Sequence, residues 1–134
     1  MLIREIQPEE TWPLRHRVMW PDHPIDFVKI EEDKEGIHYG LFLDENLTSV
    51  VSCFESNGEM QFRKFATSLD HQGKGWGSKL LLHLLEEAKK KGCKRVWCNA
   101  RLEKKGFYER FGMVDTFNRF QKSGKDYTIM EIRF

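Results

Sequence analysis

The stretch that decides the fold is Phe65-Ala66-Thr67-Ser68-Leu69-Asp70-His71-Gln72-Gly73-Lys74-Gly75-Trp76-Gly77-Ser78, which joins a predicted strand to a long amphipathic helix. Its three glycines occupy alternate positions, so the backbone can turn tightly and direct successive N–H groups outward. The helix that follows adds the unpaired N–H groups of its first turn and its positive dipole end. Together these features predict a site for an anion, above all a phosphate. A glycine-rich turn without a ligand is the alternative.

The segments before this loop read as strands and one helix. Short apolar runs bounded by turn residues predict strands at 2–6, 37–43, 47–54 and 59–67, and the gaps between the last three fit antiparallel hairpins. A helix is expected to begin at Pro8 and to end before Pro21, because two prolines in four residues interrupt a helix. Residues 25–35 are expected to form either a short helix or a loop.

The segments after the loop change the period of the pattern. Leucines at helical spacing predict a helix over 78–91, and a strand follows at 95–99. Strand, helix and strand at this length form a crossover unit with two parallel strands. A second helix over 103–110 and two strands at 113–120 and 127–134 complete the chain. We therefore expect an α+β fold, a mixed and mostly antiparallel sheet of about seven strands with one crossover and about four helices.

Composition indicates one domain over residues 1–134. The chain is 40% apolar, with ten Phe and four Trp, which is enough for a sizeable core. Its 22 Lys and Arg against 21 Asp and Glu give a net charge of +1, which argues against a nucleic-acid partner. No run approaches the about 20 apolar residues of a membrane span, and no signal-peptide core opens the chain, so we expect no membrane association.

The cysteines point to a cytoplasmic protein without disulfides. Cys53, Cys93 and Cys98 are odd in number and accompany no export signal, so reduced thiols are expected. No second pair of Cys or His follows at zinc-ligand spacing, so no metal site is predicted.

The loop residues Gln72-Gly73-Lys74-Gly75-Trp76-Gly77 match neither the ATP-binding P-loop nor the dinucleotide fingerprint. They resemble the signature Gln/Arg-x-x-Gly-x-Gly/Ala of the GNAT superfamily of N-acetyltransferases at every specified position. The segment 106–113 is similar to that family's Phe-Tyr-x-x-x-Gly-Phe segment, with Met113 in place of the last Phe. The order of elements agrees over nearly the whole chain.

This resemblance implies direct transfer of an acetyl group from acetyl-CoA to a primary amine of a small molecule or peptide. It implies that loop amides hold the pyrophosphate, and that the end of the preceding strand pairs with the pantetheine arm like an added strand. One of those strand N–H groups would also stabilise the charge that develops on the thioester carbonyl. The cofactor-binding residues implied are Phe65, Ala66, Thr67, Gln72, Gly73, Lys74, Gly75, Trp76, Gly77, Ser78 and Asn99. For Lys74 a plain surface role is the alternative.

The resemblance implies that Tyr108 is the catalytic acid that protonates the departing thiolate, the alternative being a packing role. The general base departs from the family pattern, because Gln61 and Arg63 stand where Glu or His is common and neither takes up a proton at neutral pH. Deprotonation through water by another group remains open, with His38, Glu55 and Glu59 as candidates, as does an acceptor whose amine pKa is low.

Strand alternation would place Gln61, Arg63, Phe65 and Thr67 on one face. If that face lines the acceptor cleft, Arg63 binds an anionic group of the substrate; an intramolecular salt bridge is the alternative. Trp20 lies in the segment that resembles the other wall of the acceptor site, and it is either a substrate contact or a core residue. A catalytically inactive module that binds or senses acyl-CoA is the competing function, and edge strands near the C-terminus offer a surface for a homodimer.

Overall fold

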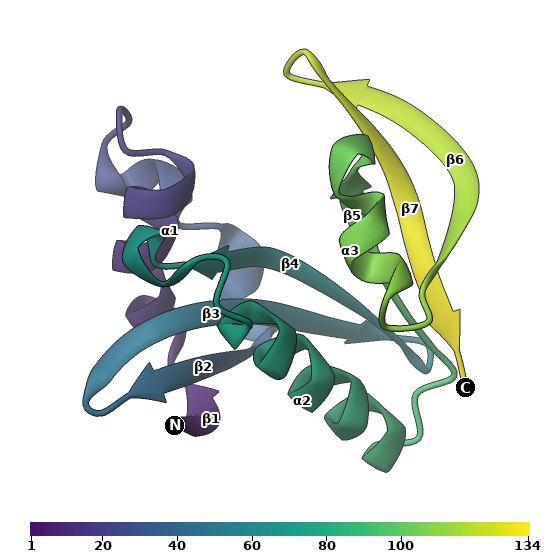
Figure 1. Cartoon of the computed structure of the whole chain (residues 1–134), viewed down its shortest axis with the longest axis horizontal. Helices are drawn as coiled ribbons and strands as arrows, with labels where there is room; N and C mark the ends of the chain where they lie inside the picture. Colours follow the sequence, from purple (N-terminus) through teal and green to yellow (C-terminus); the bar gives the residue numbers. More distant parts are fainter.

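The chain folds around one seven-stranded sheet (Figure 1). The structure is a computed structural model that describes residues 1–134. The strands are β1 (Leu2–Ile6), β2 (Ile37–Leu43), β3 (Asn46–Ser56), β4 (Glu59–Thr67), β5 (Arg95–Arg101), β6 (Val114–Lys122) and β7 (Lys125–Arg133). Their order in the sheet is β1-β2-β3-β4-β5-β7-β6, and only β4 and β5 pair in parallel. The prediction of a mixed, mostly antiparallel sheet with one crossover is confirmed.

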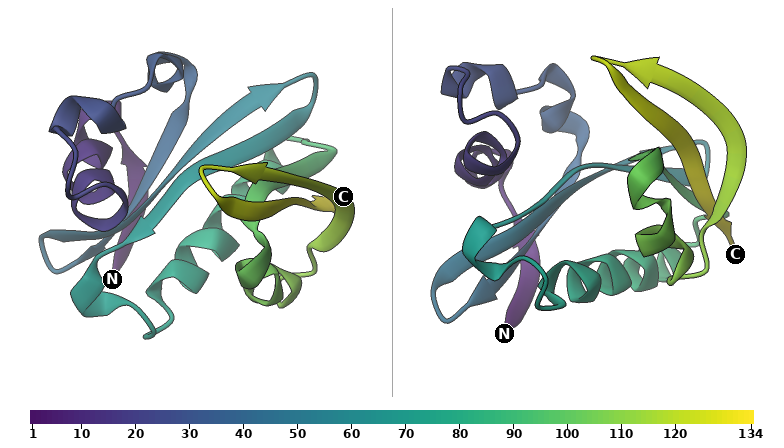
Figure 2. Two further views of the ribbon diagram at one scale, coloured as in Figure 1. Left: turned by 90° about the horizontal axis from the view of Figure 1, so that it is seen from above. Right: turned by 45° about the horizontal axis from the view of Figure 1, so that its top comes forward.

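Helices cover both faces of this sheet. The α-helices are α1 (Pro8–Met19), α2 (Trp76–Lys90) and α3 (Lys105–Glu109), and the 3-10 helices are η1 (Ile25–Val28), η2 (Glu31–Glu35), η3 (Leu69–His71) and η4 (Leu102–Lys104). The segment that the sequence left open at 25–35 therefore contains two short 3-10 helices. In Figure 1 and the right-hand view of Figure 2, α2 lies on one face, whereas α1, η1 and the β6–β7 hairpin rise on the other. None of the helices is long and apolar enough to cross a membrane.

The main core lies between α2 and the sheet. Leu80, Leu81, Leu84 and Ala88 of α2 expose no surface and pack against buried side chains of β2, β3, β4 and β5. This is the leucine stripe that helical spacing predicted. The helix begins two residues before the predicted start, at Trp76, because Gly75 adopts a left-handed conformation (φ +86°) that ends the loop.

A β-bulge interrupts β4 at Lys64. The flanking register pairs are Ser52 with Arg63 and Val50 with Ala66, so Lys64 and Phe65 both lie opposite the single residue Val51. Lys64 has φ +57°, in the left-handed region that side chains other than glycine rarely occupy. The extra residue shifts every later side chain of β4 to the other face of the sheet.

The predicted common face of Gln61, Arg63, Phe65 and Thr67 is therefore wrong for its last two members. Phe65 packs against the core under α2, and the Thr67 hydroxyl oxygen lies beside Gly77 of α2. Ala66, which alternation would have placed under α2, is buried on the α1 face instead. Strand alternation holds only as far as the bulge, and the sequence carries no sign of the bulge.

We expect Leu84→Ala to lower the free energy of unfolding by about 2–5 kcal/mol, because it opens a cavity in the core beneath α2. Urea denaturation followed by circular dichroism measures this change. Leu82→Ala, on the exposed side of the same helix where the leucine is 50% accessible, is the matched control and should change stability by less than about 0.5 kcal/mol. Equal losses from the two variants would contradict this assignment of the core.

Candidate functional site

The sheet opens between its two parallel strands. β4 and β5 pair only through Glu59–Arg95, Met60–Val96 and Gln61–Trp97. Beyond these pairs the two strands separate, while β4 stays paired to β3 as far as Thr67 and β5 stays paired to β7 as far as Arg101 (Figure 1). The edges that face each other across the opening therefore have backbone groups without a strand partner. Such an edge can pair with an extended ligand.

The glycine loop continues directly from the open end of β4. Gly73 (φ +75°) and Gly75 both need left-handed backbone, and no atom lies within 4 Å of where a Cβ would stand on either. Gly77 differs, because a Cβ there would lie 3.2 Å from the Thr67 hydroxyl oxygen. The Gln72 side-chain amide donates a hydrogen bond of 2.9 Å to the Thr67 carbonyl. The loop is thus open to solvent on its outer side and held against β4 on its inner side.

The start of α2 supplies donors at the same place. No side chain caps this helix, and its first turn contains no acidic residue. The first backbone N–H bonded within the helix is that of Lys79, which donates to the Gly75 carbonyl at 3.2 Å. The N–H groups before it are therefore free to bind a ligand, and they carry the positive end of the helix dipole. Lys74 is exposed and forms no ion pair, so the site fits an anion.

Tyr108 lies where β4 and β5 separate. Its ring centroid is 5.9 Å from that of Phe62, the first β4 residue after the last parallel pair, and 5.1 Å from that of Phe107. Burial raises the pKa of Tyr108 well above its usual value, and the nearby Cys98 of β5 adds to this effect. The phenol therefore stays protonated at neutral pH and makes no hydrogen bond within the chain. A protonated phenol there is able to donate a proton at the vertex of the opening.

The thiols cannot serve as nucleophiles in this structure. Cys98 is 2% exposed, and burial raises its pKa to about 12. Burial also raises the pKa of Cys53, which is 1% exposed. Because the thiolate is the reactive form, both side chains are inert at neutral pH.

The remaining predicted residues lie on the α1 face or near it. Arg63 pairs in register with Ser52, and its guanidinium carbon lies 5.7 Å from the centre of the Phe54 ring without any ion pair, so the predicted alternative of a salt bridge is not observed. Gln61 is half-buried, and Asn99 is exposed on the face of β5 opposite Cys98. Trp20 is half-buried in an aromatic cluster, with ring centroids 5.4 Å from His23 and 5.1 Å from Phe27.

None of the three candidate bases faces the opening with a free side chain. His38 is 1% exposed, with Nδ1 2.7 Å from the Ser52 hydroxyl and Nε2 2.9 Å from the Asp33 carbonyl. Because a carbonyl only accepts, Nε2 carries the proton and Nδ1 accepts from Ser52. Glu55 is ion-paired with Lys91 and Glu59 with Arg95, both near the turn where β4 is still paired with β5.

A buried ion pair fixes the α1 face. Arg15 donates to both carboxylate oxygens of Asp33, at 2.8 and 2.9 Å, and to the Ser52 hydroxyl at 2.7 Å. Burial alone would raise the pKa of Asp33, but the hydrogen bonds and charge of Arg15 outweigh it, and the net pKa is lowered. Sequence analysis missed this pair, because Asp33 stands in the charged run 31–35, which is typical of a solvated surface.

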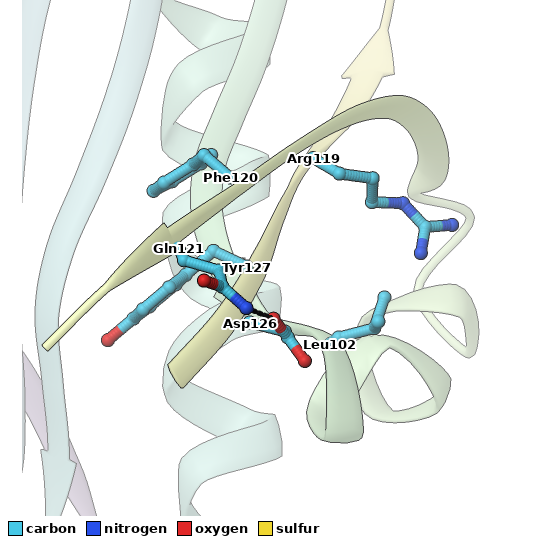
Figure 3. Close-up of a pocket in the computed structure, with 6 residues that line it drawn as sticks. All are labelled: Leu102, Arg119, Phe120, Gln121, Asp126 and Tyr127. Atoms are coloured by element: carbon cyan, nitrogen blue, oxygen red, sulfur yellow. Dashed lines mark hydrogen bonds between the residues drawn. The ribbon is translucent and has the colours of Figure 1, made fainter. Parts of the chain in front are cut away.

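A separate cavity lies at the β6–β7 hairpin. It has a volume of about 280 Å³ and contains none of the residues predicted for the site. Figure 3 shows its lining, which consists of Leu102, Arg119, Phe120, Gln121, Asp126 and Tyr127.

Comparison with known proteins agrees with the fold. The model of the Acetyltransferase (GNAT) family matches residues 2–113. The uncharacterized N-acetyltransferase YitI of Bacillus subtilis (strain 168) is 30% identical, over 91% of this chain and 88% of its own. The ribosomal-protein-S18-alanine N-acetyltransferase of Escherichia coli has the same fold, with a TM-score of 0.80 at 17% identity over 98% of this chain and 92% of that one. A Bacillus subtilis acetyltransferase in complex with CoA matches with a TM-score of 0.77 at 18% identity, over 98% of this chain and 97% of that one.

We expect Asp33→Asn to lower the free energy of unfolding by about 3–5 kcal/mol at neutral pH, because it leaves the Arg15 charge buried without its partner. Since the pKa of Asp33 is depressed in the folded protein, its contribution is lost as pH falls through that pKa. The difference in free energy of unfolding between the variant and the wild type should therefore become smaller below about pH 4. Denaturant titrations at several pH values measure it. Asp26→Asn, which removes an exposed carboxylate paired with Lys29, is the control and should leave stability nearly unchanged; a comparable loss there would contradict the prediction.

Proposed function

This chain belongs to the GNAT family of acetyltransferases, and we propose that it moves the acetyl group of acetyl-CoA directly to a primary amine of a small molecule or peptide. The family makes it an acyltransferase; the donor, the acceptor class and the residue roles are the proposal. One observation carries it above all. The unpaired edge of β4 leads through an open glycine loop into the uncapped start of α2.

The donor is proposed because its two parts match the two parts of this surface. Coenzyme A has an arm with amide groups and a diphosphate. The edge of β4 over residues 65–67 can pair with amides, and the amides of residues 72–78 can bind a diphosphate, with Lys74 adding positive charge. The related Bacillus subtilis structure that contains CoA supports this choice. Asn99 is proposed as a polar contact to the arm from β5, where its side chain is exposed.

When bound, acetyl-CoA supplies an activated acetyl thioester. A backbone N–H of the 65–67 edge stabilises negative charge on the carbonyl oxygen as the new N–C bond forms. The Tyr108 hydroxyl then gives its proton to the sulfur as the C–S bond breaks. Burial keeps this phenol protonated, and it also keeps the nearest thiol, Cys98, unreactive. Direct transfer to the amine therefore fits this site better than a cysteine-bound acyl group.

The acceptor is proposed to bind on the α1 face, against Gln61, Arg63 and Trp20. Gln61 and Arg63 take up no proton at neutral pH, and His38 is enclosed by its hydrogen bonds. No side chain is therefore proposed as the base, and the amine gives its proton to water. Three free cysteines, all buried, support the further proposal of a reducing compartment such as the cytoplasm.

We expect the protein to bind coenzyme A in isothermal titration, and Gly75→Ala to weaken this binding roughly tenfold or more, because a side chain disfavours the left-handed turn that aims the loop amides. Gly92→Ala is the matched control: Gly92 has φ +79° and equally open surroundings, but it lies at the other end of α2. Both variants should lose about 1 kcal/mol of stability, and only the first should lose affinity. No binding by the wild type would overturn the proposed function.

We expect Tyr108→Phe to bind coenzyme A normally and to turn over about 100-fold more slowly or worse, because it removes the proton donor for the leaving sulfur. Release of free thiol from acetyl-CoA, measured with a panel of primary amines, gives the rate. An unchanged rate would remove Tyr108 from the mechanism. Binding without thiol release by the wild type, with every amine of the panel, would favour a sensing module over an enzyme.

A further inference from the structure

Lys64 is held in place by the bulge and has no partner. It is half-buried and takes part in no ion pair or side-chain hydrogen bond, although its backbone is in a rare left-handed conformation. Burying a lysine and fixing it at positive φ both cost free energy, and no ion pair or side-chain hydrogen bond of Lys64 offsets that cost. A half-buried lysine without a partner, in strained backbone beside a proposed binding site, is typical of a residue that binds a ligand.

The charges around Lys64 are mostly positive. Burial lowers its pKa most, and the charges of Arg63, Arg15 and Lys122 lower it further, while that of Asp33 raises it. Of these neighbours, only Arg15 is neutralised, by Asp33 itself. Arg63, Lys64 and Lys122 have no acidic partner. Their net effect is a local excess of positive charge in a protein whose net charge is only +1.

These three cations lie on the side of the sheet from which the acceptor is proposed to enter. Arg63 and Lys64 immediately precede the strand edge proposed for the thioester arm. Lys122 ends β6 at the tip of the hairpin, which rises on the α1 face of the sheet (Figure 2). Tyr108 packs from the other face, in the core under α2. An amine that reaches the thioester from the α1 face therefore meets Arg63 and Lys64 first.

We propose that Arg63, Lys64 and Lys122 bind an anionic group of the acceptor, so that this enzyme acetylates amines that carry a carboxylate. This inference rests on the proposed function. A carboxylate placed among the three cations would offset the burial of Lys64 and form charge-assisted hydrogen bonds with Arg63. It would also bring an amino group of the same small molecule to the open end of β4. Lys64 is thus a specificity-determining residue, created by the bulge.

The test compares acceptors that differ only in this charge. Glycine, β-alanine and γ-aminobutyrate are each offered beside their carboxamides, with spermidine as an amine without any anion. We expect kcat/KM for the preferred carboxylate to exceed that for its carboxamide roughly tenfold or more. Lys64→Met and Arg63→Met should each remove this preference by raising KM for the carboxylate. KM for the carboxamide should rise less than KM for the carboxylate, and isothermal titration of each variant with coenzyme A shows whether its cofactor site is intact.

Lys90→Met is the matched control, because Lys90 is an exposed lysine of α2 without an ion pair, and this variant should keep the full preference. Equal use of carboxylate and carboxamide, or acetylation of spermidine alone, would overturn the inference and leave the proposed function standing. Acetylation of no carboxylate-bearing amine by protein that binds coenzyme A would also overturn it. If the wild type does not bind coenzyme A, the proposed function itself is wrong. That result is distinct from the absence of a preference for carboxylates.

Discussion

Separation of two parallel strands is the constraint on which the site depends. β4 and β5 share three residue pairs and then diverge, and aromatic rings of α3 pack against β4 where they diverge. Tyr108 packs on Phe62 there, and Phe107 packs on Phe65 one step further along β4. Without this separation the edge of β4 would be satisfied by β5, and no backbone group would remain for a ligand. Packing of the core thus keeps backbone groups along this edge of β4 without hydrogen-bond partners.

The core under α2 holds the two strands of the opening in fixed positions. The buried leucines of α2 pack on strands from both sides of the opening, so the helix fixes β4 relative to β5 although the two strands no longer touch there. The same helix presents its uncapped first turn at the end of β4. The helix α2 therefore contributes both the packing that fixes the strands and the free backbone N–H groups at the end of β4.

The bulge at Lys64 changes which face of the sheet the side chains of β4 occupy. Before the bulge, Arg63 lies on the α1 face above the buried Arg15–Asp33 pair; after it, Phe65 joins the core. Arg15 and Asp33 neutralise each other and tie α1, η2 and β3 into one wall. Arg63 and Lys64 are partly buried beside the opening and have no acidic partner, which is why charge there points to a ligand rather than to stability.

Local patterns in the sequence determined much of this protein. Residues near one another in the chain set the leucine spacing of α2, the hairpin gaps and the glycines at 73, 75 and 77. The crossover and the tight glycine turn before α2 could therefore be predicted. The tertiary structure alone decided the rest. Which face Phe65 and Thr67 occupy depends on the register of β4 against β3, and the roles of Asp33 and Lys64 depend on charges that lie far away in sequence. Registers and buried charge pairs are long-range properties, and periodicity carries no record of them.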